Sequence, residues 1–314
     1  MTKKSPIAPM TEEQKKVFFE IVQYAAEMAL SQVQIDYDQF MRVVENLGEL
    51  RDAIALRVIE LATSDLYSKN DGSTNPIYLY TYPKNFKTKP IKEQIDALHQ
   101  FFPGVGSAEE DWAVWEIYLQ HALADYHLNS IPYGAEGWRA TLRWERIAPT
   151  YGQAVEKVLE KIASLRQFKN SRQDGRPGLS QLCRREDAAK MAQRLGDEQK
   201  EHSILVFPAQ FGLAHSRHSV RRTRGLLPGR VLEFELGAFE VGIMLLTHPE
   251  RLQSADDLGI ICSGDEFAPG AYGSLSLAPS FSINAEGVME FDARWCDYFL
   301  PGYGAATGFL PPPR

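Results

Sequence analysis

The sequence predicts an α+β protein, with a mainly helical N-terminal region and a smaller mixed α/β C-terminal region of short strands. Up to residue 202, apolar residues recur mostly at three- and four-residue spacing, which is typical of helices. After residue 202, short apolar runs alternate with Gly, Pro and Asn turns, which is typical of strands. For a chain of 314 residues we therefore expect two domains, a helical one over 1–202 and a mixed α+β one over 203–314.

In the first region, capping boxes at Thr11–Gln14 and Ser107–Glu110 mark the start of two helices. The periodicity predicts helices over 11–29, 40–61, 91–101, 107–126, 135–147, 150–168 and 186–201. A turn-rich segment over 68–90 and a polar loop over 169–178 separate them.

In the second region, the apolar run 203–207 predicts a buried strand, and 238–246 predicts a helix that ends at His248-Pro249. Short strands are expected over 259–262, 274–277, 281–283 and 288–291, with a hairpin connection at 284–287. The last residues, from Pro301, are so rich in Gly and Pro that we expect a tail without regular structure.

The composition excludes several classes of protein. Hydrophobic residues are 44% and charged residues 24% of the chain, as in globular domains rather than disordered chains. The most apolar stretch, Leu236–Leu246, carries Glu240 and falls short of the roughly 18 apolar residues of a membrane span. The first residues lack the apolar segment of a secretory signal. Three cysteines without a C-x-x-C pair favour free thiols in the cytoplasm over a disulfide framework or zinc site.

Cofactor motifs are equally scarce. The chain has no G-x-x-x-x-G-K-[ST] phosphate loop, no G-x-G-x-x-G after a strand and no G-x-S-x-G nucleophile elbow. We therefore predict no cofactor and no bound metal, and we favour a protein without enzymatic activity.

The net charge of −7 conceals an uneven distribution. Residues 203–232, the Arg-rich segment, have a charge of +5 and no Asp, Glu or Lys, whereas residues 233–314 have a charge of −9. Its arginines are Arg217, Arg221, Arg222, Arg224 and Arg230. Guanidinium groups bind phosphate oxygens bidentately, so the segment predicts an anion-binding surface. The alternative is internal pairing with the acidic residues that follow.

A second basic stretch lies between residues 72 and 92. Tyr78, Tyr80 and Tyr82 alternate there near lysines, a combination that single-stranded nucleic acid binders use for base stacking. The alternative is a short strand that packs on the helices.

A metal-dependent hydrolase or nuclease is the second interpretation. His215 and His218 are three residues apart and can share one helical face, and Asp265 and Glu266 can add carboxylates. Against this, the segment around the two histidines contains five arginines and no carboxylate, which opposes metal binding. These four residues are the candidate catalytic groups.

The string Ser263-Gly-Asp-Glu-Phe267 resembles the signature of diguanylate cyclases, which implies a nucleotide-binding hairpin with metal-holding acids. The resemblance covers five residues, only 47 residues follow Phe267, and Ala-Pro-Gly interrupts the second strand that such a hairpin needs. We therefore interpret the string as an acidic turn.

Taken together, the sequence predicts a cytoplasmic interaction or adaptor protein that engages an anionic partner, such as nucleic acid or an acidic protein surface, through the Arg-rich segment. The alternatives are the metal-dependent hydrolase and a structural or assembly subunit that forms homo-oligomers. No membrane partner is expected.

Overall fold

A computed structural model describes the chain in several ranges. These are residues 82–84, 86–106, 132, 134–172, 178–199, 202–216, 218–227, 232–267, 277–297 and 300–310, together with Lys16. The chain divides into two units, Met1–Thr63 and Ser64–Arg314, and the description below concerns the second. Apart from Lys16, the helices expected over 11–29, 40–61 and 107–126 lie outside the described residues.

One sheet has four antiparallel strands in the order β1-β4-β11-β5. Its strands are β1 (Gly137–Leu142), β4 (Ile204–Gln210), β5 (Glu233–Glu235) and β11 (Thr307–Phe309). Every residue of β4 is buried, because β4 lies in the middle of the sheet with both faces covered. This is why its sequence is a continuous apolar run rather than an alternating one.

The other sheet has seven strands, of which β10-β6-β8-β7-β3 form a path and β9 joins β8 to β2. Its strands are β2 (Phe168–Asn170), β3 (Leu182–Arg184), β6 (Gly259–Ile261), β7 (Asp265–Phe267), β8 (Leu277–Ile283), β9 (Met289–Trp295) and β10 (Tyr303–Ala305). The long hairpin of β8 and β9 pairs from Leu277 with Trp295 to Ile283 with Met289. The connection between these two strands is the turn predicted at 284–287. There the side-chain oxygen of Asn284 accepts hydrogen bonds from the backbone N–H groups of Glu286 and Val288.

The α-helices of the described residues are α4 (Ile91–Phe101), α6 (Tyr151–Leu165), α7 (Glu186–Glu198), α8 (Val220–Leu226) and α9 (Ala238–Thr247). Single 3-10 turns add η1 (Trp144–Arg146), η2 (Leu179–Gln181), η3 (Leu213–His215) and η5 (Pro249–Arg251). Helix α6 begins at the predicted position, and Thr150 caps it, since the Thr150 hydroxyl accepts a hydrogen bond from Gln153 N. Val155, Val158 and Ile162 lie on the apolar face of α6 and are buried.

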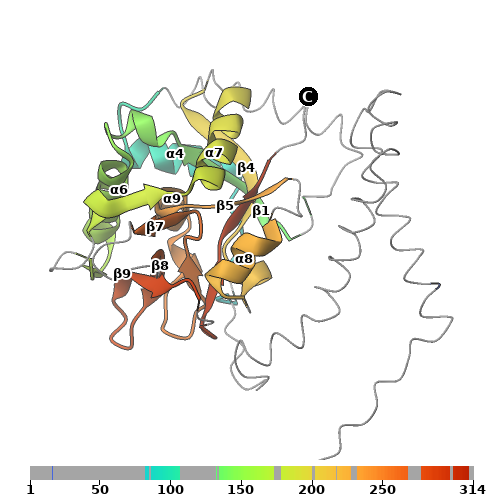
Figure 1. Cartoon of the computed structure of the whole chain (residues 1–314). Coiled ribbons are helices and arrows are strands. Elements are labelled where there is room, and N and C mark those ends of the chain that lie inside the picture. Colours follow the sequence, from blue (N-terminus) through green and yellow to red (C-terminus); the bar gives the residue numbers. More distant parts are fainter. Residues whose placement is uncertain are drawn as a thin grey trace, which may run out of the picture. The chain divides into compact units, whose positions relative to one another are not determined.

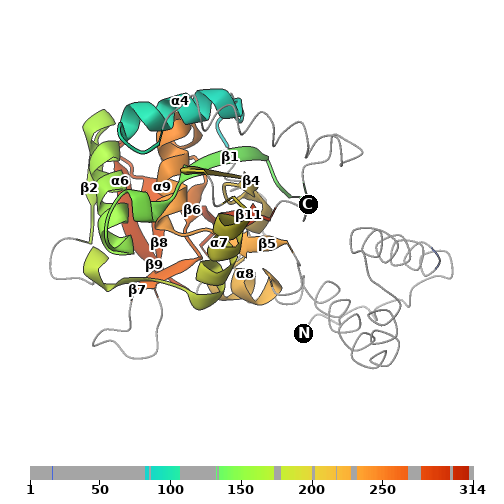
Figure 2. The ribbon, with the colours of Figure 1, turned by 90° about the horizontal axis from the view of Figure 1, so that it is seen from above.

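Helix α9 lies in the interior of the unit, in contact with both α6 and β1 (Figures 1 and 2). All of its residues are buried, including Glu240. The helices predicted over 91–101, 150–168, 186–201 and 238–246 are thereby confirmed, with shorter bounds for two of them. Within the described ranges, no helix has both the length and the apolar character needed to cross a bilayer.

The predicted division into a helical region before residue 202 and a strand-rich region after it is wrong. Strands on the two sides of residue 202 pair with each other, β1 with β4, β2 with β9 and β3 with β7. The segment expected as a helix over 135–147 is strand β1 followed by η1. In β1 nearly every residue is buried, so no alternation marks it as a strand, and Trp138 and Leu142 at a spacing of four imitate a helix.

The expected irregular tail is also wrong for Tyr303–Phe309, which passes from one sheet to the other. It forms β10 beside β6, and then β11 between β4 and β5. The glycines there make close packing possible. A Cβ atom on Gly304 would lie 2.0 Å from the carbonyl oxygen of Gly212, and one on Gly308 would lie 2.7 Å from the ring of Phe234.

Candidate functional site

A cavity of about 440 Å³ opens between the end of β1, the start of α6, helix α7, and strands β4 and β5. We call it the Arg184 cavity. Its lining residues are Thr141, Leu142, Arg143, Trp144, Glu145, Tyr151, Arg184, Ala189, Ala192, Gln193, Leu195, Gly196, Asp197, Leu205, Phe207, Phe234 and Glu240. Cavities of a few hundred cubic ångströms with mostly apolar walls are typical of sites for small organic molecules.

Aromatic rings form much of the wall. Trp144 and Tyr151 meet edge to face with ring centres 5.7 Å apart, and Phe207 and Phe234 are tilted against each other at the same separation. Trp144 and Tyr151 are half-buried, while the phenylalanines come from the inner strand β4 and from β5 at the edge of the same sheet. The walls therefore offer flat, rigid surfaces of low polarity.

An ion pair between Arg184 and Glu240 forms the polar part of the lining. Arg184 Nη2 donates to Glu240 Oε1 at 2.5 Å, and the two side chains are only 10% and 9% exposed. The guanidinium also lies over the ring of Tyr151, 5.3 Å from its centre. Glu240 Oε2 accepts a hydrogen bond from Gly237 N at the start of α9, and Arg184 Nε has no partner among the described residues.

Asp265 lies directly behind this lining and is fully buried. Its Oδ2 accepts hydrogen bonds from Tyr151 Oη at 2.8 Å and from Ala238 N at 2.6 Å, so it caps α9. Burial, reinforced by the neighbouring Glu240 carboxylate, raises the pKa of Asp265 to about 7, although Arg184, Ala238 N and Tyr151 oppose the shift. A Cβ atom on Gly237 would lie 2.5 Å from Asp265 Oδ1, so this arrangement requires glycine there.

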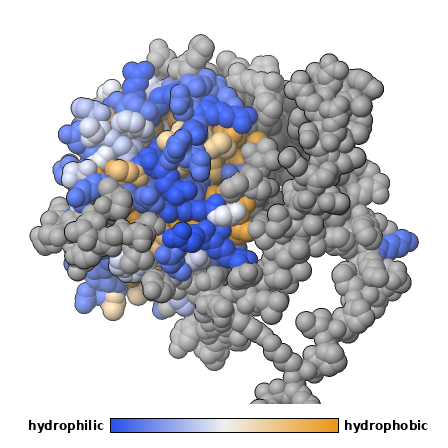
Figure 3. All heavy atoms as spheres, viewed as in Figure 1, coloured by the Kyte–Doolittle hydropathy of each residue, from blue (hydrophilic) through white to orange (hydrophobic). Residues whose placement is uncertain are grey.

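The exposed lining residues include two carboxylates, Glu145 and Asp197. The cation beside them, Arg143, is bound to the protein itself. It donates to the carbonyl oxygens of Gly196, Gln199 and His202 at distances of 2.6–2.8 Å, which satisfies the end of α7. The face over α7 and α8 is mainly hydrophilic (Figure 3).

Of the four predicted catalytic residues, the two histidines lie next to each other, whereas Asp265 and Glu266 contact other partners. His215 is buried, with its Nε2 2.7 Å from Glu233 Oε1, an oxygen that also accepts from Thr307 Oγ1. The His218 ring lies 5.8 Å from that of His215. In the described part of the chain, no three His, Cys, Asp or Glu side chains form a group able to hold a metal ion.

The string resembling the diguanylate cyclase signature is not the acidic turn that we expected. Residues Asp265–Phe267 form strand β7, which pairs with β3 and β8. Asp265 points to the start of α9, whereas Glu266 forms an ion pair with Arg224 at 3.1 Å. The strand alternation therefore sends the two carboxylates to different partners.

The structure places the arginines of the Arg-rich segment as follows. Arg224 is 9% exposed and donates to the carbonyl oxygens of Ser263 and Asp265 as well as to Glu266. Arg221 is exposed and paired with Asp297, and Arg222 donates its backbone N–H to Ser219 Oγ as the capping contact of α8. Arg217 and Arg230 lie outside the described residues.

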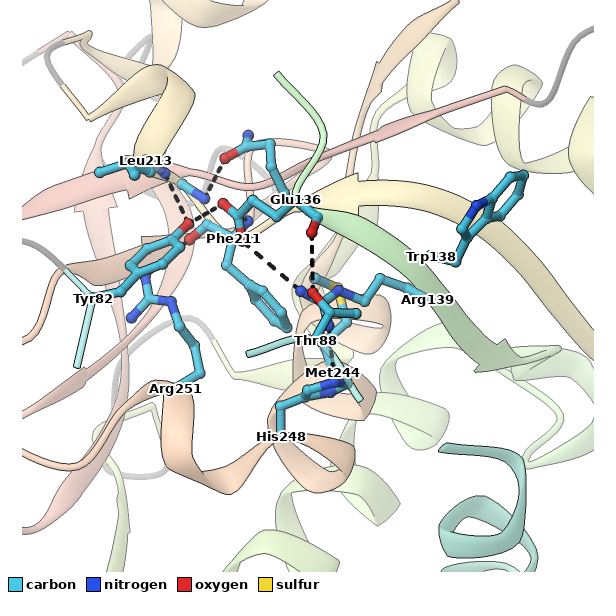
Figure 4. Close-up of polar contacts among 12 residues, drawn as sticks. Tyr82, Thr88, Glu136, Trp138, Arg139, Phe211, Leu213, Met244, His248 and Arg251 are labelled. Carbon is cyan, nitrogen blue, oxygen red and sulfur yellow. Dashed lines mark hydrogen bonds and ion pairs between the residues drawn. The ribbon is translucent and has the colours of Figure 1, made fainter. Parts of the chain in front are cut away.

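Of the tyrosines predicted to stack on bases, Tyr78 and Tyr80 lie outside the described residues. Tyr82 belongs to a second cluster of buried charge (Figure 4). Its hydroxyl donates to Glu136, and Arg251 covers its ring at 3.8 Å from the ring centre. That face of the ring is therefore occupied by the protein.

Two fully buried arginines, Arg139 and Arg251, define this second cluster. Arg139 Nη1 lies 2.8 Å from His248 Nε2, which also accepts from Lys89 N at 3.0 Å. Burial lowers the pKa of His248 to about 2, with Arg139 and Lys89 adding to the shift, so the imidazole is neutral and its Nδ1–H faces Thr247 Oγ1. These contacts fasten the segment around Lys89 to the end of α9.

The cavity residues Trp144, Tyr151, Arg184 and Glu240 were not among the predicted site residues. One signal was present, since Glu240 is the single charged residue of the apolar stretch Leu236–Leu246. A carboxylate in a wholly buried helix needs a buried partner, but the sequence does not show that the partner is Arg184, 56 residues away. Comparisons of this chain with protein-family models, with curated proteins and with solved structures found no match.

Proposed function

We propose that this protein binds a small, largely apolar organic molecule in the Arg184 cavity. The observation that supports this most directly is a cavity of about 440 Å³ whose aromatic walls surround a buried ion pair. Aromatic walls provide the affinity for an apolar molecule, and a few fixed polar groups provide its orientation.

The geometry favours binding over catalysis. Tyr151 donates to Asp265, and Arg184 is paired with Glu240, so the polar groups near the cavity already hold one another. Such a preformed arrangement suits a receptor or carrier of a small molecule.

Filling the cavity tests this proposal. Ala192 lines it from α7, and Ala192→Trp adds an indole ring within it; Ala163→Trp places the same ring on an exposed position of α6 as a matched control. With indole as the probe in ligand-observed NMR, we expect saturation transfer for the wild type and Ala163→Trp, and at least a tenfold weaker effect for Ala192→Trp. Equal binding by all three proteins, or no binding by the wild type to indole and a panel of similar fragments, would contradict the proposal.

Engagement of nucleic acid or an acidic protein surface through the Arg-rich segment stays a prediction, as does a role as an assembly subunit. To bind a phosphate, Arg224 would have to leave two carbonyl oxygens and Glu266, and Arg221 would have to leave Asp297. These contacts support the internal-pairing alternative. The metal-dependent hydrolase lacks a comparable supporting observation.

A cytoplasmic location also belongs to the proposal. Cys183 is exposed, Cys262 and Cys296 are buried, and none of the three forms a disulfide bond. Cysteines outside disulfide bonds accord with a reducing compartment.

A further inference from the structure

The ion pair of the Arg184 cavity offers a donor and an acceptor side by side. Arg184 Nε–H is buried and has no acceptor in the described protein, and it is Nη2 of the guanidinium that bonds to Glu240. Each oxygen of Glu240 accepts one hydrogen bond, from Arg184 or from Gly237 N, and a carboxylate oxygen can accept a second. The pair therefore matches a ligand edge that carries an acceptor next to a donor.

The pair is neutral as a whole, which determines the charge that suits the ligand. An added carboxylate or phosphate would compete with Glu240 for Arg184 and would lie near the buried Asp265. The lining as a whole has three carboxylates, those of Glu145, Asp197 and Glu240, against the two guanidinium groups of Arg143 and Arg184, so its formal net charge of −1 also opposes an anion. The electrostatics therefore disfavour anionic ligands.

The walls determine the shape. Four rings line the cavity, those of Trp144, Tyr151, Phe207 and Phe234. Flat aromatic ligands stack on such rings at little cost in conformational entropy.

Resting on the proposed function, we propose that the Arg184 cavity selects an uncharged planar heterocycle with a hydrogen-bond donor beside an acceptor, as in a lactam or a nucleobase. The acceptor of the heterocycle meets Arg184 and its donor meets Glu240, while its ring lies among the aromatic side chains. The phosphorylated form of such a molecule is excluded by its charge.

A matched series of ligands tests this selectivity on the intact protein. Replacing Arg184 or Glu240 would leave a buried charge without its partner, so the ligand is varied instead. The probes are 2-quinolone, which has adjacent N–H and C=O groups, 1-methyl-2-quinolone, which lacks the donor, and quinoline-2-carboxylate, which is an anion. Affinities are measured by titration calorimetry or by NMR.

We expect 2-quinolone to bind about tenfold more tightly than 1-methyl-2-quinolone, because the methyl group removes a hydrogen bond to a charged acceptor. Quinoline-2-carboxylate should bind at least tenfold more weakly than 2-quinolone, and the double variant Glu145→Gln/Asp197→Asn should reduce that discrimination. Similar affinities for all three probes, each lost in Ala192→Trp, would overturn the selectivity while leaving the proposed function in place. Absence of binding by any probe, indole included, would count against the proposed function itself.

Discussion

At the scale of single residues, Asp265 shows how one buried carboxyl group serves structure and electrostatics together. It caps the central helix α9 through Ala238 N and orients Tyr151, which lines the Arg184 cavity. Full burial opposes its ionisation, and the helix start and Arg184 only partly compensate. The carboxyl group therefore titrates near neutral pH.

This pKa predicts a pH dependence of stability. With a folded-state pKa of about 7 against 3.8 for the ordinary side chain, the folded protein holds the Asp265 proton more tightly than the unfolded chain. The contribution of Asp265 to the free energy of unfolding therefore falls as the pH rises from about 4 to 7, by about 1.4 kcal/mol per pH unit, and is constant outside that window.

Asp265→Asn keeps an oxygen to accept from Tyr151 and Ala238 N but cannot titrate. Urea unfolding of both proteins at several pH values between 4 and 7 should show that the wild type loses stability relative to Asp265→Asn as the pH rises. If the free energies of unfolding of the two proteins changed with pH in parallel, the raised pKa of Asp265 would be refuted.

At the scale of elements, the strand that runs through β10 and β11 joins the two sheets. Its backbone passes against that of Gly212 at Gly304, and Gly212 has a φ of +119°, which favours glycine. Gly308 lies between the rings of Phe207 and Phe234. The glycines therefore make room for the crossing, and their abundance does not indicate an irregular tail.

Two alanine substitutions separate packing from flexibility. Gly304→Ala would bring a Cβ atom against the Gly212 carbonyl, so we expect a destabilisation of about 3 kcal/mol, the upper end of ordinary overpacking. Gly225→Ala is the control, since Gly225 lies in α8 with open space around it; alanine there should stabilise by about 0.5–1 kcal/mol. Chemical unfolding measures both, and a Gly304→Ala protein as stable as the wild type would disprove the close crossing.

At the scale of the whole molecule, the two sheets combine strands from distant parts of the sequence. The partners of β4, β7 and β9 include β1, β3 and β2, all of which precede residue 202. Because strands from both sides of residue 202 contribute to the same hydrophobic core, neither side has a core of its own. Residues Ser64–Arg314 form one unit, and the boundary predicted near residue 202 falls inside it.

Truncation tests this cooperativity. A fragment of residues 64–314 should give a well-dispersed amide NMR spectrum, because it retains every described strand pair. A fragment of residues 203–314 should give the narrow spectrum of an unfolded chain, since it lacks β1, β2 and β3. A dispersed spectrum from the shorter fragment would show that the C-terminal region folds alone.

The sequence by itself determined the elements whose pattern is local. The amphipathic periodicity of α6, the apolar run of β4 and the turn at Asn284–Gly287 depend on neighbouring residues, and each is found where it was predicted. Only the tertiary structure decided the rest. Strand β1 is covered on both faces and β11 is inserted between β4 and β5, so neither shows the alternation of a half-exposed strand.

The site depended even more on tertiary structure. The cavity brings together Tyr151, Arg184 and Glu240 from three elements, and the arginines of α8 meet Glu266 and Asp297 through tertiary contacts rather than proximity in the chain. A sequence shows how many charges a segment carries. Which charges neutralise one another depends on contacts between residues tens of positions apart, and folding alone sets these, because a buried charge is stable only beside its partner.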